Sequence, residues 1–380
     1  MKQIYYIGQY SNFKNTRNLR IHPSTITKMN YILSALKKAN LKVHIFSTAE
    51  TCNTFFCLYS REKIFIDDYE TITYINTFGG PTIFVKVFSR IWAMVQLFFF
   101  LLIEVRQNDK VLVYHGMLYK WPIKIALIFK KINFYFEVEE LYCAVKLRSI
   151  IKIQKEIKYL QNAKGYILVN DLIADKCAFI NKPIAICYGD YSMTTLKKGS
   201  FSDENIHLVY AGLIEGKSSD VYLAIQTMCH LPTNYKLHIL GYGTPKNIKT
   251  LKEKVLELND LLGNECITYD GCLSGMEYFS FLSKCDIGLC TRVLDDRHSV
   301  YTFPSKVLVY LGNNLITICS PISSVIHSQV SNYIVFTKNI TSQSIADSVL
   351  SIKKKQNIVT GNILNLLDEK FVKSLILLFN

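Results

Sequence analysis

The sequence lacks the patterns that mark several common classes of protein. Its 11 cysteines include no Cys-x-x-Cys pair, and Cys187, Cys290 and Cys319 lie inside apolar runs, so we expect buried, reduced thiols rather than disulfides or zinc ligands. Neither an Asp-x-Asp spacing nor a cluster of histidine and cysteine indicates a metal site. The first residues, MKQIYYIGQYSNF, show no apolar stretch with a cleavage site, so we expect no signal peptide.

A continuous apolar run long enough to cross a bilayer is also missing. In the stretch RIWAMVQLFFFLLIEV, the apolar part from Ile91 to Ile103 is interrupted by Gln96, and it falls short of the about 20 residues that a spanning helix needs. We therefore expect no transmembrane helix. Two alternatives stay open: a helix buried against a sheet, or a surface helix that dips into a membrane with Lys86 and Arg90 at the headgroups.

What is present is an ordinary globular composition with an uneven charge. The chain has 380 residues, 49% hydrophobic and 19% charged, which favours two domains over one. Of the net charge of +14, residues 1–190 carry 26 Lys and Arg against 14 Asp and Glu, and residues 191–380 carry 18 against 16. The first half therefore meets an acidic partner, such as anionic lipid or a phosphorylated acceptor. Nucleic acid ranks last, because the basic residues are dispersed.

Short β-rich runs alternate with longer helical patterns, which indicates parallel sheets flanked by helices and hence the α/β class. In the first half we expect a helix at 24–39, capped by Ser24 or Thr25. The strands expected in this half are 3–8, 41–47, 110–115, 131–138 and 165–170. After the polar segment 194–205 the pattern restarts, with strands at 206–212, 235–243, 266–271, 285–290 and 315–320. We predict domains at 1–190 and 191–365, and a C-terminal helix at 366–380.

The segment TFPSKVLVYLGNN places Pro304, Ser305 and Lys306 directly before an apolar helical run. A lysine at the start of a helix is unfavourable, because the helix dipole already makes that end positive. An anion held by the free backbone N–H groups, Ser305 and Lys306 would remove the conflict. The alternative is a lysine that points into solvent.

Two further strand-to-helix turns carry glycine or lysine. YAGLIEGKSSD contains Gly212 and then Lys217, and LGYGTPKN contains Gly241 and Gly243. The second lacks the third glycine of a dinucleotide fingerprint, which disfavours a dehydrogenase. Because open α/β sheets bind ligands at the carboxyl ends of their strands, we expect these turns and the Lys306 segment to surround a diphosphate.

These segments resemble glycosyltransferases of family 4. LVYAGLIEGK, YKLHILGYG, YDGCLSGMEYFSFLSKCDIGL and FPSKVLVYL occur in the order and spacing of that family over 206–320, and the likeness is looser over 110–190. More narrowly, they resemble bacterial transferases that build capsule, O-antigen or exopolysaccharide chains. The resemblance implies a GT-B fold, with two Rossmann-like, doubly wound parallel-sheet domains facing an interdomain cleft. It also implies that 1–190 binds the acceptor and that 191–365 binds the nucleotide-sugar.

The same resemblance implies the reaction and its setting. A sugar would pass from a nucleotide-sugar donor to a lipid-linked or oligosaccharide acceptor, without a metal or cofactor and with retention of the anomeric configuration. Since the first half is basic, we expect a cytoplasmic protein held peripherally on the anionic inner face of the cell membrane. Nucleic acid is not an expected partner.

The motifs and the resemblance together give a set of donor-binding residues: Gly212, Lys217, Gly241, Gly243, Gly271, Leu273, Arg292, Ser305 and Lys306. The Asp270–Leu273 turn corresponds to the place where the nucleoside base stacks on backbone. Glu277, in the following helix, is expected to be a solvated residue.

Acceptor and catalytic candidates lie in the first half. His115, at the end of a predicted strand, matches a histidine near the reacting sugar in the family, although a lone histidine is as often structural. EVEELY brings Glu137, Glu139 and Glu140 close together after another strand. They form either a solvated loop or a site that binds the acceptor hydroxyl, where a general base would have to lie within about 3 Å of it.

Two departures from the family pattern keep other functions open. Leu213 follows Gly212 where the family has an arginine that contacts the nucleotide, and Val309 stands where it has a ribose-binding glutamate. Arg292 is a candidate replacement for the missing cation. The alternative function is a non-catalytic GT-B-like subunit that binds a partner transferase or a polysaccharide. A sugar-nucleotide epimerase of the same fold is a third possible function, after the glycosyltransferase and the non-catalytic subunit.

Overall fold

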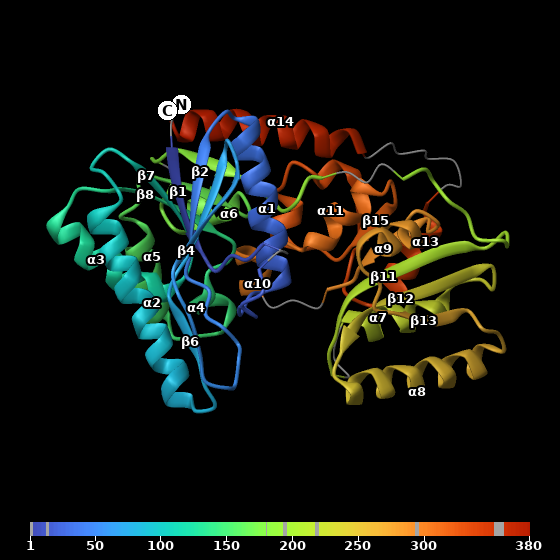
Figure 1. Cartoon of the computed structure of the whole chain (residues 1–380). Helices are drawn as coiled ribbons and strands as arrows, with labels where there is room; N and C mark the ends of the chain where they lie inside the picture. Colours follow the sequence, from blue (N-terminus) through green and yellow to red (C-terminus); the bar gives the residue numbers. More distant parts are fainter. Residues whose placement is uncertain are drawn as a thin grey trace. The chain divides into compact units, whose positions relative to one another are not determined.

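The computed structural model describes residues 3–12, 15–179, 181–192, 196–216, 220–292, 296–352 and 361–380. Its contacts divide the chain into two units. The first unit comprises Met1–Asp190 together with Asp368–Asn380, and the second comprises Tyr191–Leu367. Each unit is built on a parallel β-sheet covered by helices (Figure 1), so the predicted α/β class is confirmed.

The sheet of the first unit has eight strands in the order β10-β9-β8-β7-β1-β2-β5-β4. All neighbours are parallel except β4, which is antiparallel to β5. The strands are β1 Gln3–Gly8, β2 Lys42–Ser47, β4 Glu62–Asp67, β5 Glu70–Tyr74, β7 Lys110–Tyr114, β8 Asn133–Val138, β9 Gly165–Leu168 and β10 Ile184–Ile186. Two further short strands, β3 Cys57–Tyr59 and β6 Thr77–Gly79, pair with each other.

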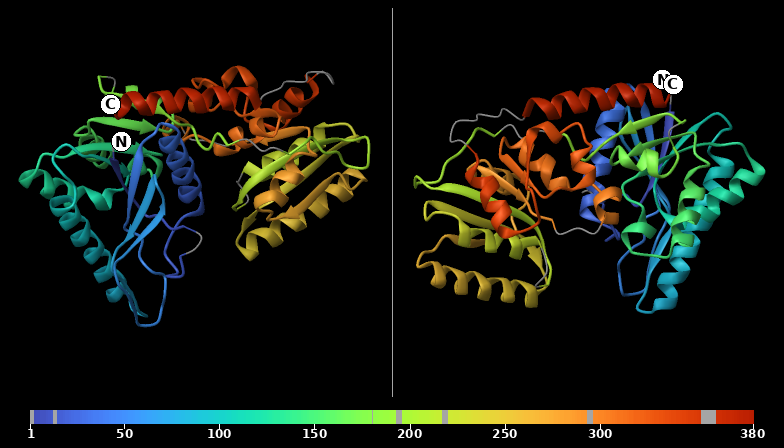
Figure 2. Two further views of the ribbon diagram at one scale, coloured as in Figure 1. Left: turned by 45° about the horizontal axis from the view of Figure 1, so that its top comes forward. Right: turned by 180° about the vertical axis from the view of Figure 1, so that it is seen from behind.

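Helices cover both faces of this sheet. They are α1 Pro23–Lys38, α2 Ile83–Ile103, α3 Lys120–Phe129, α4 Tyr142–Val145, α5 Ile150–Leu160 and α6 Leu172–Lys176. Figures 1 and 2 show α1 on one face and α2 with α3 on the other. The predicted cap of α1 is wrong: the helix starts at Pro23, after His22, because the fixed φ of proline suits the first helical position.

The sheet of the second unit has six strands in the order β13-β12-β11-β14-β15-β16, all of them parallel. Counted along the chain this order is 3-2-1-4-5-6, which is that of the doubly wound nucleotide-binding fold. The strands are β11 Ile206–Ile214, β12 Tyr235–Gly243, β13 Ile267–Gly271, β14 Ile287–Cys290, β15 Ile316–Cys319 and β16 Ile334–Phe336.

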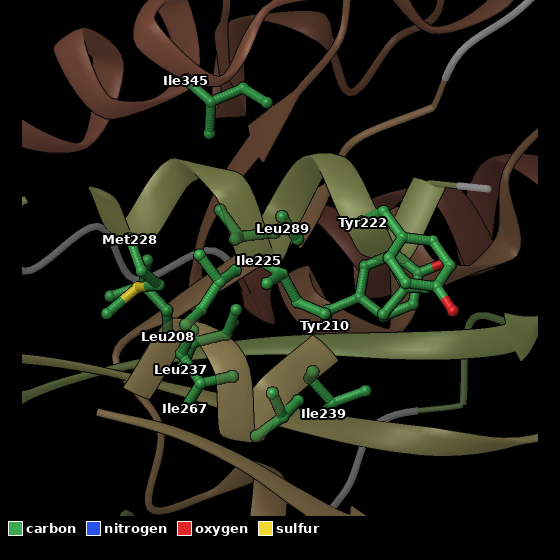
Figure 3. Close-up of a cluster of buried hydrophobic side chains, with 14 of the residues drawn as sticks. Leu208, Tyr210, Tyr222, Ile225, Met228, Leu237, Ile239, Ile267, Leu289 and Ile345 are labelled. Atoms are coloured by element: carbon green, nitrogen blue, oxygen red, sulfur yellow. The ribbon is translucent and has the colours of Figure 1, made fainter. Parts of the chain in front are cut away.

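Helices flank this sheet in the second unit (Figure 1). They are α7 Asp220–Thr227, α8 Pro245–Leu262, α9 Gly275–Leu282, α10 Asp296–Tyr301, α11 Ser305–Gly312, α12 Ser323–Ile326 and α13 Ser342–Leu350. Figure 3 shows the main core, in which Ile225 of α7 and Met228, directly after α7, lie over Leu208, Leu237 and Ile267 of the strands. Burial of these side chains fixes the strands whose carboxyl ends carry the candidate site.

α2 is longer than the apolar run read from the sequence. It has 21 residues, and its length and hydropathy would allow it to cross a membrane, so the length argument against a spanning helix was wrong. One side of α2 packs on the first sheet, where Phe100 stacks on Phe46 with ring centroids 4.0 Å apart. The alternative of a helix packed on a sheet is therefore confirmed for that side. The opposite side is exposed.

The last helix, α14, runs from Gly361 to Leu378. Its residues from Asp368 onward belong to the first unit. There, the Phe371 ring stacks on the Tyr31 ring with centroids 5.9 Å apart, and the Phe379 ring packs on the Tyr135 ring with centroids 4.9 Å apart. The first unit therefore takes part of its core from the far end of the chain.

Candidate functional site

In the second unit, the strand order reverses between β11 and β14, and such a reversal is where open α/β sheets bind ligands. The two strands pair at Leu208–Ile287 and Val209–Gly288. Further along, the hydroxyl of Tyr310 lies between them: it accepts a hydrogen bond from Ala211 N–H at 2.9 Å and donates one to the Leu289 carbonyl at 3.4 Å. Tyr310 thus replaces direct strand pairing at the place where the two strands separate.

Glycine at position 288 makes room for this tyrosine. A Cβ on Gly288 would lie 2.4 Å from the Tyr310 ring, closer than atoms can approach without displacement. Tyr310 lies one helical turn after Lys306 on α11, so both side chains leave the same face of the helix. The tyrosine therefore anchors α11 in the orientation that aims Lys306 at the end of β11.

Lys306 lies over the ring of Tyr210, with Nζ 4.1 Å from the centroid, as in a cation–π contact. The same Nζ would be 3.2 Å from a Cβ on Gly212, so it lies beside the predicted glycine at the strand end. In the described part of the chain it makes no ion pair. Burial lowers the pKa of Lys306, although the Cys290 thiol and Asp220 oppose that shift. An anion bound here would oppose that shift and stabilise the charged form of Lys306.

The start of α11 carries the other predicted groups. Ser305 is the exposed first residue, Pro304 is the N-cap rather than the first helical residue, and no side chain caps this end. No acidic residue occupies the first turn, so the positive end of the dipole is not neutralised from within the helix. The structure therefore brings Ser305, Lys306 and Gly212 together, as the sequence predicted.

Further groups near Lys306 include one that the sequence proposed and one that it missed. Arg292 is half-buried, and its charge lowers the pKa of Lys306. Asp220 is the first residue of α7, and its backbone carbonyl accepts a hydrogen bond from Thr291 at 3.0 Å. Nothing in the sequence marked Asp220, because its proximity to Lys306 arises only when β11 and β14 lie side by side. Lys217 lies outside the described residues.

Two buried thiols, Cys290 and Cys319, lie close to Lys306 and Arg292. Cys290 and Cys319 are register partners at the ends of β14 and β15, and both are fully buried and free, as the sequence predicted. A hydrogen bond from Cys319 lowers the pKa of Cys290, helped by the charges of Lys306 and Arg292.

The glycines of LGYG do not form the strand-to-helix turn that the sequence predicted. Gly241 and Gly243 lie within β12, and Thr244 caps α8 instead by accepting a hydrogen bond from Asn247 N–H. A Cβ on Gly241 would lie 1.9 Å from the Gly212 carbonyl oxygen, and one on Gly243 would lie 2.4 Å from that of Ile214. Close approach of β11 and β12 therefore explains both glycines without a ligand.

The predicted base-stacking turn follows β13. Gly271 has φ of +89°, a conformation that glycine adopts without strain. Leu273 is partly buried and packs on the small core around Val209 and Leu240. Glu277 is exposed on α9, which agrees with a solvated residue.

In the first unit, a buried charged cluster lies at the carboxyl ends of β1 and β8. Glu137 is fully buried and accepts a hydrogen bond from the Tyr6 hydroxyl. Burial, with the nearby charge of Glu139, raises its pKa well above the ordinary value. Lys28 of α1 forms an ion pair with Glu139 at 3.3 Å and donates to the Cys187 carbonyl. The sequence predicted the carboxylates but missed Lys28, because in the sequence Lys28 is an ordinary polar residue of an amphipathic helix.

His115 lies behind this cluster. Its ring is buried, Nδ1 lies 3.2 Å from the Glu140 carbonyl, and Nε2 lies 3.3 Å from Glu156 Oε1. Burial lowers the pKa of His115 to about 4. Burial also raises the pKa of Glu156, whose carboxyl group accepts hydrogen bonds from the backbone N–H groups of Tyr142 and Cys143 at 3.1 and 2.8 Å. The structure thus joins His115 to the EVEELY segment through Glu140.

The two clusters differ in chemistry. The second unit offers a half-buried lysine, an arginine and an uncapped helix start, which suit an anion. The first unit offers two neighbouring carboxyl groups, Glu137 and Glu139, beside Lys28, and these groups suit hydroxyl groups of a ligand. Among the residues that the structure describes, no group of three or more His, Cys, Asp or Glu side chains is placed to hold a metal ion.

No protein-family model and no curated protein matches the sequence. Solved structures match over nearly the whole chain. The E. coli trehalose-6-phosphate structure bound with UDP-2-fluoro glucose has a TM-score of 0.63 and 12% identity, covering 99% of this chain and 96% of that one. The UDP-forming trehalose-phosphate synthase of Burkholderia xenovorans in complex with glucose-6-phosphate has a TM-score of 0.65 and 10% identity, covering 99% and 98%.

A third similar structure is HepE of Anabaena in complex with UDP, with a TM-score of 0.60 and 10% identity, covering 98% of this chain and 96% of that one. At these identities the likeness concerns the fold. The two Rossmann-like units found here therefore make up a GT-B fold, as the sequence predicted.

Proposed function

We propose that this protein is a glycosyltransferase that uses a nucleotide-sugar donor bound by its second unit. The observation that carries the proposal is the position of Lys306, whose half-buried ammonium lies at an uncapped helix start, beside Gly212, where the strand order reverses. The similar structures contain UDP or a UDP-sugar in two of the three cases described, which supports a nucleoside diphosphate as the anion.

Charge development on the leaving group accounts for this arrangement. As the glycosidic bond breaks, negative charge grows on the diphosphate, and fixed cations with helix N–H groups stabilise it where it forms. Lys306 and the start of α11 would meet one phosphate, with Arg292 near by. We propose that no metal takes part in this step.

The acceptor is proposed to bind in the first unit. Burial and the charge of Glu139 raise the pKa of Glu137, which favours a role as a hydrogen-bonding partner of a sugar over one as a base. Glu139, partly exposed and paired with Lys28, is better placed to accept a hydrogen bond from an acceptor hydroxyl. His115, buried behind them, orients the EVEELY segment.

The finer assignment rests on the resemblance to family 4 glycosyltransferases. It favours a lipid-linked or oligosaccharide acceptor, transfer with retention, and a role in bacterial surface polysaccharide synthesis. The similar trehalose-phosphate synthase in complex with glucose-6-phosphate instead favours a small sugar phosphate as acceptor. The two acceptor classes therefore have to be compared by experiment.

Calorimetric titration of the purified protein with UDP-, GDP-, ADP- and dTDP-sugars tests the donor site. We expect Lys306→Ala to weaken binding of the preferred donor by about tenfold or more, since hydrogen bonds to charged groups contribute about 1.5–3 kcal/mol. The melting temperature should stay nearly unchanged. Lys217→Ala is expected to act in the same direction.

Lys252→Ala is the matched control, because Lys252 also lies over a tyrosine ring of the second unit, with Nζ 5.7 Å from the Tyr269 centroid, but on the exposed side of α8. It should bind donor like the wild type. Equal affinity in all three variants would remove the donor site from this position.

A second candidate is a non-catalytic GT-B-like subunit. Leu213 stands exposed after Gly212, and Val309 lies half-buried on α11, so neither supplies the polar contact that the family pattern has there. Product formation by the purified chain, with a donor panel and lipid-linked and sugar-phosphate acceptors, separates the candidates. Turnover of donor with no acceptor present would instead indicate an epimerase.

A further inference from the structure

The side of α2 that faces away from the sheet is apolar along its whole length. Its exposed residues follow helical spacing, and they include Phe84, Phe88, Ile91, Phe99 and Ile103. A helix of 21 residues is about 31 Å long, so this stripe is a long unpartnered surface. Phe84 is 81% exposed, which is unusual for a phenylalanine that serves only the core.

α3 continues the same surface. It packs beside α2 (Figures 1 and 2), with Phe129 against Phe98 and Lys130 Nζ donating to the Leu102 carbonyl at 3.0 Å. Its exposed apolar residues are Trp121, Ile125, Ile128 and Phe129. We call the exposed side chains of α2 and α3 the α2–α3 face. Soluble monomers rarely leave an apolar patch of this extent uncovered.

The charges within α2 and α3 are all basic, although Arg90 is paired with Glu50 at 3.1 Å and Glu104, directly after α2, is paired with Arg61. Neither α2 nor α3 contains Asp or Glu, whereas α2 contains Lys86 and Arg90, α3 contains Lys120 and Lys124, and Lys130 and Lys131 follow directly. Apolar and aromatic side chains with lysine and arginine at their margin form the pattern of helices that lie in a membrane interface. The basic margin complements anionic headgroups.

Tryptophan supplies an independent indication. The chain has only two tryptophans, and both lie on the α2–α3 face: Trp92 is 39% and Trp121 66% exposed. Tryptophan is enriched at the level of the lipid headgroups, because its ring is apolar and its N–H is polar.

The helices are held in a way that suits surface binding rather than crossing. α2 is fixed to the sheet by Phe100 and by Gln96, which exchanges two hydrogen bonds with the Asn76 backbone at 2.8 and 2.9 Å. Because this side packs on the sheet, only the other side can meet lipid. α3 has 10 residues, too few to span a bilayer.

We propose that the α2–α3 face binds the surface of an anionic lipid bilayer, with α2 and α3 lying in the plane of the interface. α3 begins shortly after the end of β7 and His115, with only the short helix Met117–Tyr119 between them. Since β7 pairs with β8, which leads to Glu139, we expect a lipid-linked acceptor in the bound bilayer to reach Glu139 through this part of the unit. Only this last consequence rests on the proposed function; the binding itself holds whether or not the protein transfers a sugar.

Vesicle flotation of the full-length protein tests the proposal. The probes are phosphatidylcholine vesicles with and without phosphatidylglycerol, at low and high salt. We expect flotation with the anionic vesicles, weakened by salt because the headgroup attraction is screened. Tryptophan emission should shift to shorter wavelength on binding, since both tryptophans enter the interface.

Two pairs of substitutions separate the contribution of the apolar side chains to membrane binding from that of the basic side chains. Phe84→Ser with Ile128→Ser removes two of the most exposed apolar side chains and should reduce the partition coefficient by about tenfold or more. Lys124→Glu with Lys131→Glu should abolish the preference for anionic vesicles. Leu256→Ser with Leu261→Ser, which changes two equally exposed leucines on α8, is the matched control and should float like the wild type.

Three results would overturn the proposal. One is a wild-type protein that neither floats with anionic vesicles nor changes its tryptophan emission. Another is flotation that the α2–α3 variants leave intact. The third is a stable dimer in light scattering that Phe84→Ser with Ile128→Ser dissociates, because the face would then be covered by a second copy of the chain.

Discussion

At the scale of single residues, His115 shows how burial decides protonation. Its ring lies between the Glu140 carbonyl and Glu156, out of contact with water, and burial lowers its pKa to about 4. At neutral pH it is therefore an uncharged imidazole. Such a ring can position a neighbour by hydrogen bonding but adds no positive charge to the acceptor cluster.

We expect the His115 ring protons to titrate in NMR with a midpoint near pH 4, below the about 6.5 of an unperturbed histidine. Because the unfolded chain takes up this proton first, His115 makes the free energy of unfolding fall as the pH drops from about 6.5 to about 4. His115→Gln should reduce that dependence. A midpoint near 6.5 would contradict the buried, neutral state.

Single residues also show how much of the candidate site could be predicted from the sequence. Lys306 and Ser305 were predictable, because a lysine after proline at a helix start conflicts with the helix dipole. Lys28 and Asp220 were not. Each looks like an ordinary residue of its own helix, and its partners lie more than 60 residues away along the chain.

At the scale of elements, α11 is positioned by one buried hydroxyl. Tyr310 bridges Ala211 of β11 and Leu289 of β14, and the missing side chain of Gly288 receives its ring. The helix start that carries Lys306 is therefore set by the strands on both sides of it.

We expect Tyr310→Phe to lower the free energy of unfolding by about 1–3 kcal/mol in urea denaturation, because the Ala211 N–H would be left buried without a partner. Donor affinity should fall as well, since α11 loses its anchor. Tyr333→Phe, in the partly exposed short helix Ser331–Tyr333, is the matched control. Unchanged stability in both variants would show that the hydroxyl is not needed.

Most of the regular strands could be predicted, since buried parallel strands read as continuous apolar runs. β1 matches its predicted range, and β12 does so as well. The sequence missed β3, β4, β5, β6, β10 and β16. Short or exposed strands lack such runs, and β5 (ETITY) alternates threonine with apolar residues although it is largely buried. Gly241 and Gly243 lie in the predicted strand, but we expected them to make room for a ligand, whereas here they let two strands approach closely.

At the scale of the whole molecule, the two units are not consecutive along the chain. Residues 368–380 belong to the first unit although the second unit precedes them. Phe371 and Phe379 are fully buried there, so the core of the first unit depends on side chains that no analysis of 1–190 alone includes.

Phe371→Ala should therefore destabilise the first unit by about 3–5 kcal/mol, the usual cost of truncating a buried phenylalanine. Hydrogen exchange should speed up in β1 and α1 while the strands β11–β15 keep their protection. Leu377→Ala is the matched control on the same helix, because Leu377 is 75% exposed. Equal loss of protection in both units would contradict the division.

This connectivity also sets an order of events during synthesis. Because translation is directional, all of residues 191–367 leave the ribosome before Phe371 and Phe379 do. The second unit can thus reach its native structure while the first still waits for its final segment. Until then the surfaces around Tyr31 and Tyr135 stay uncovered, and the nascent first unit is the part that needs protection by chaperones.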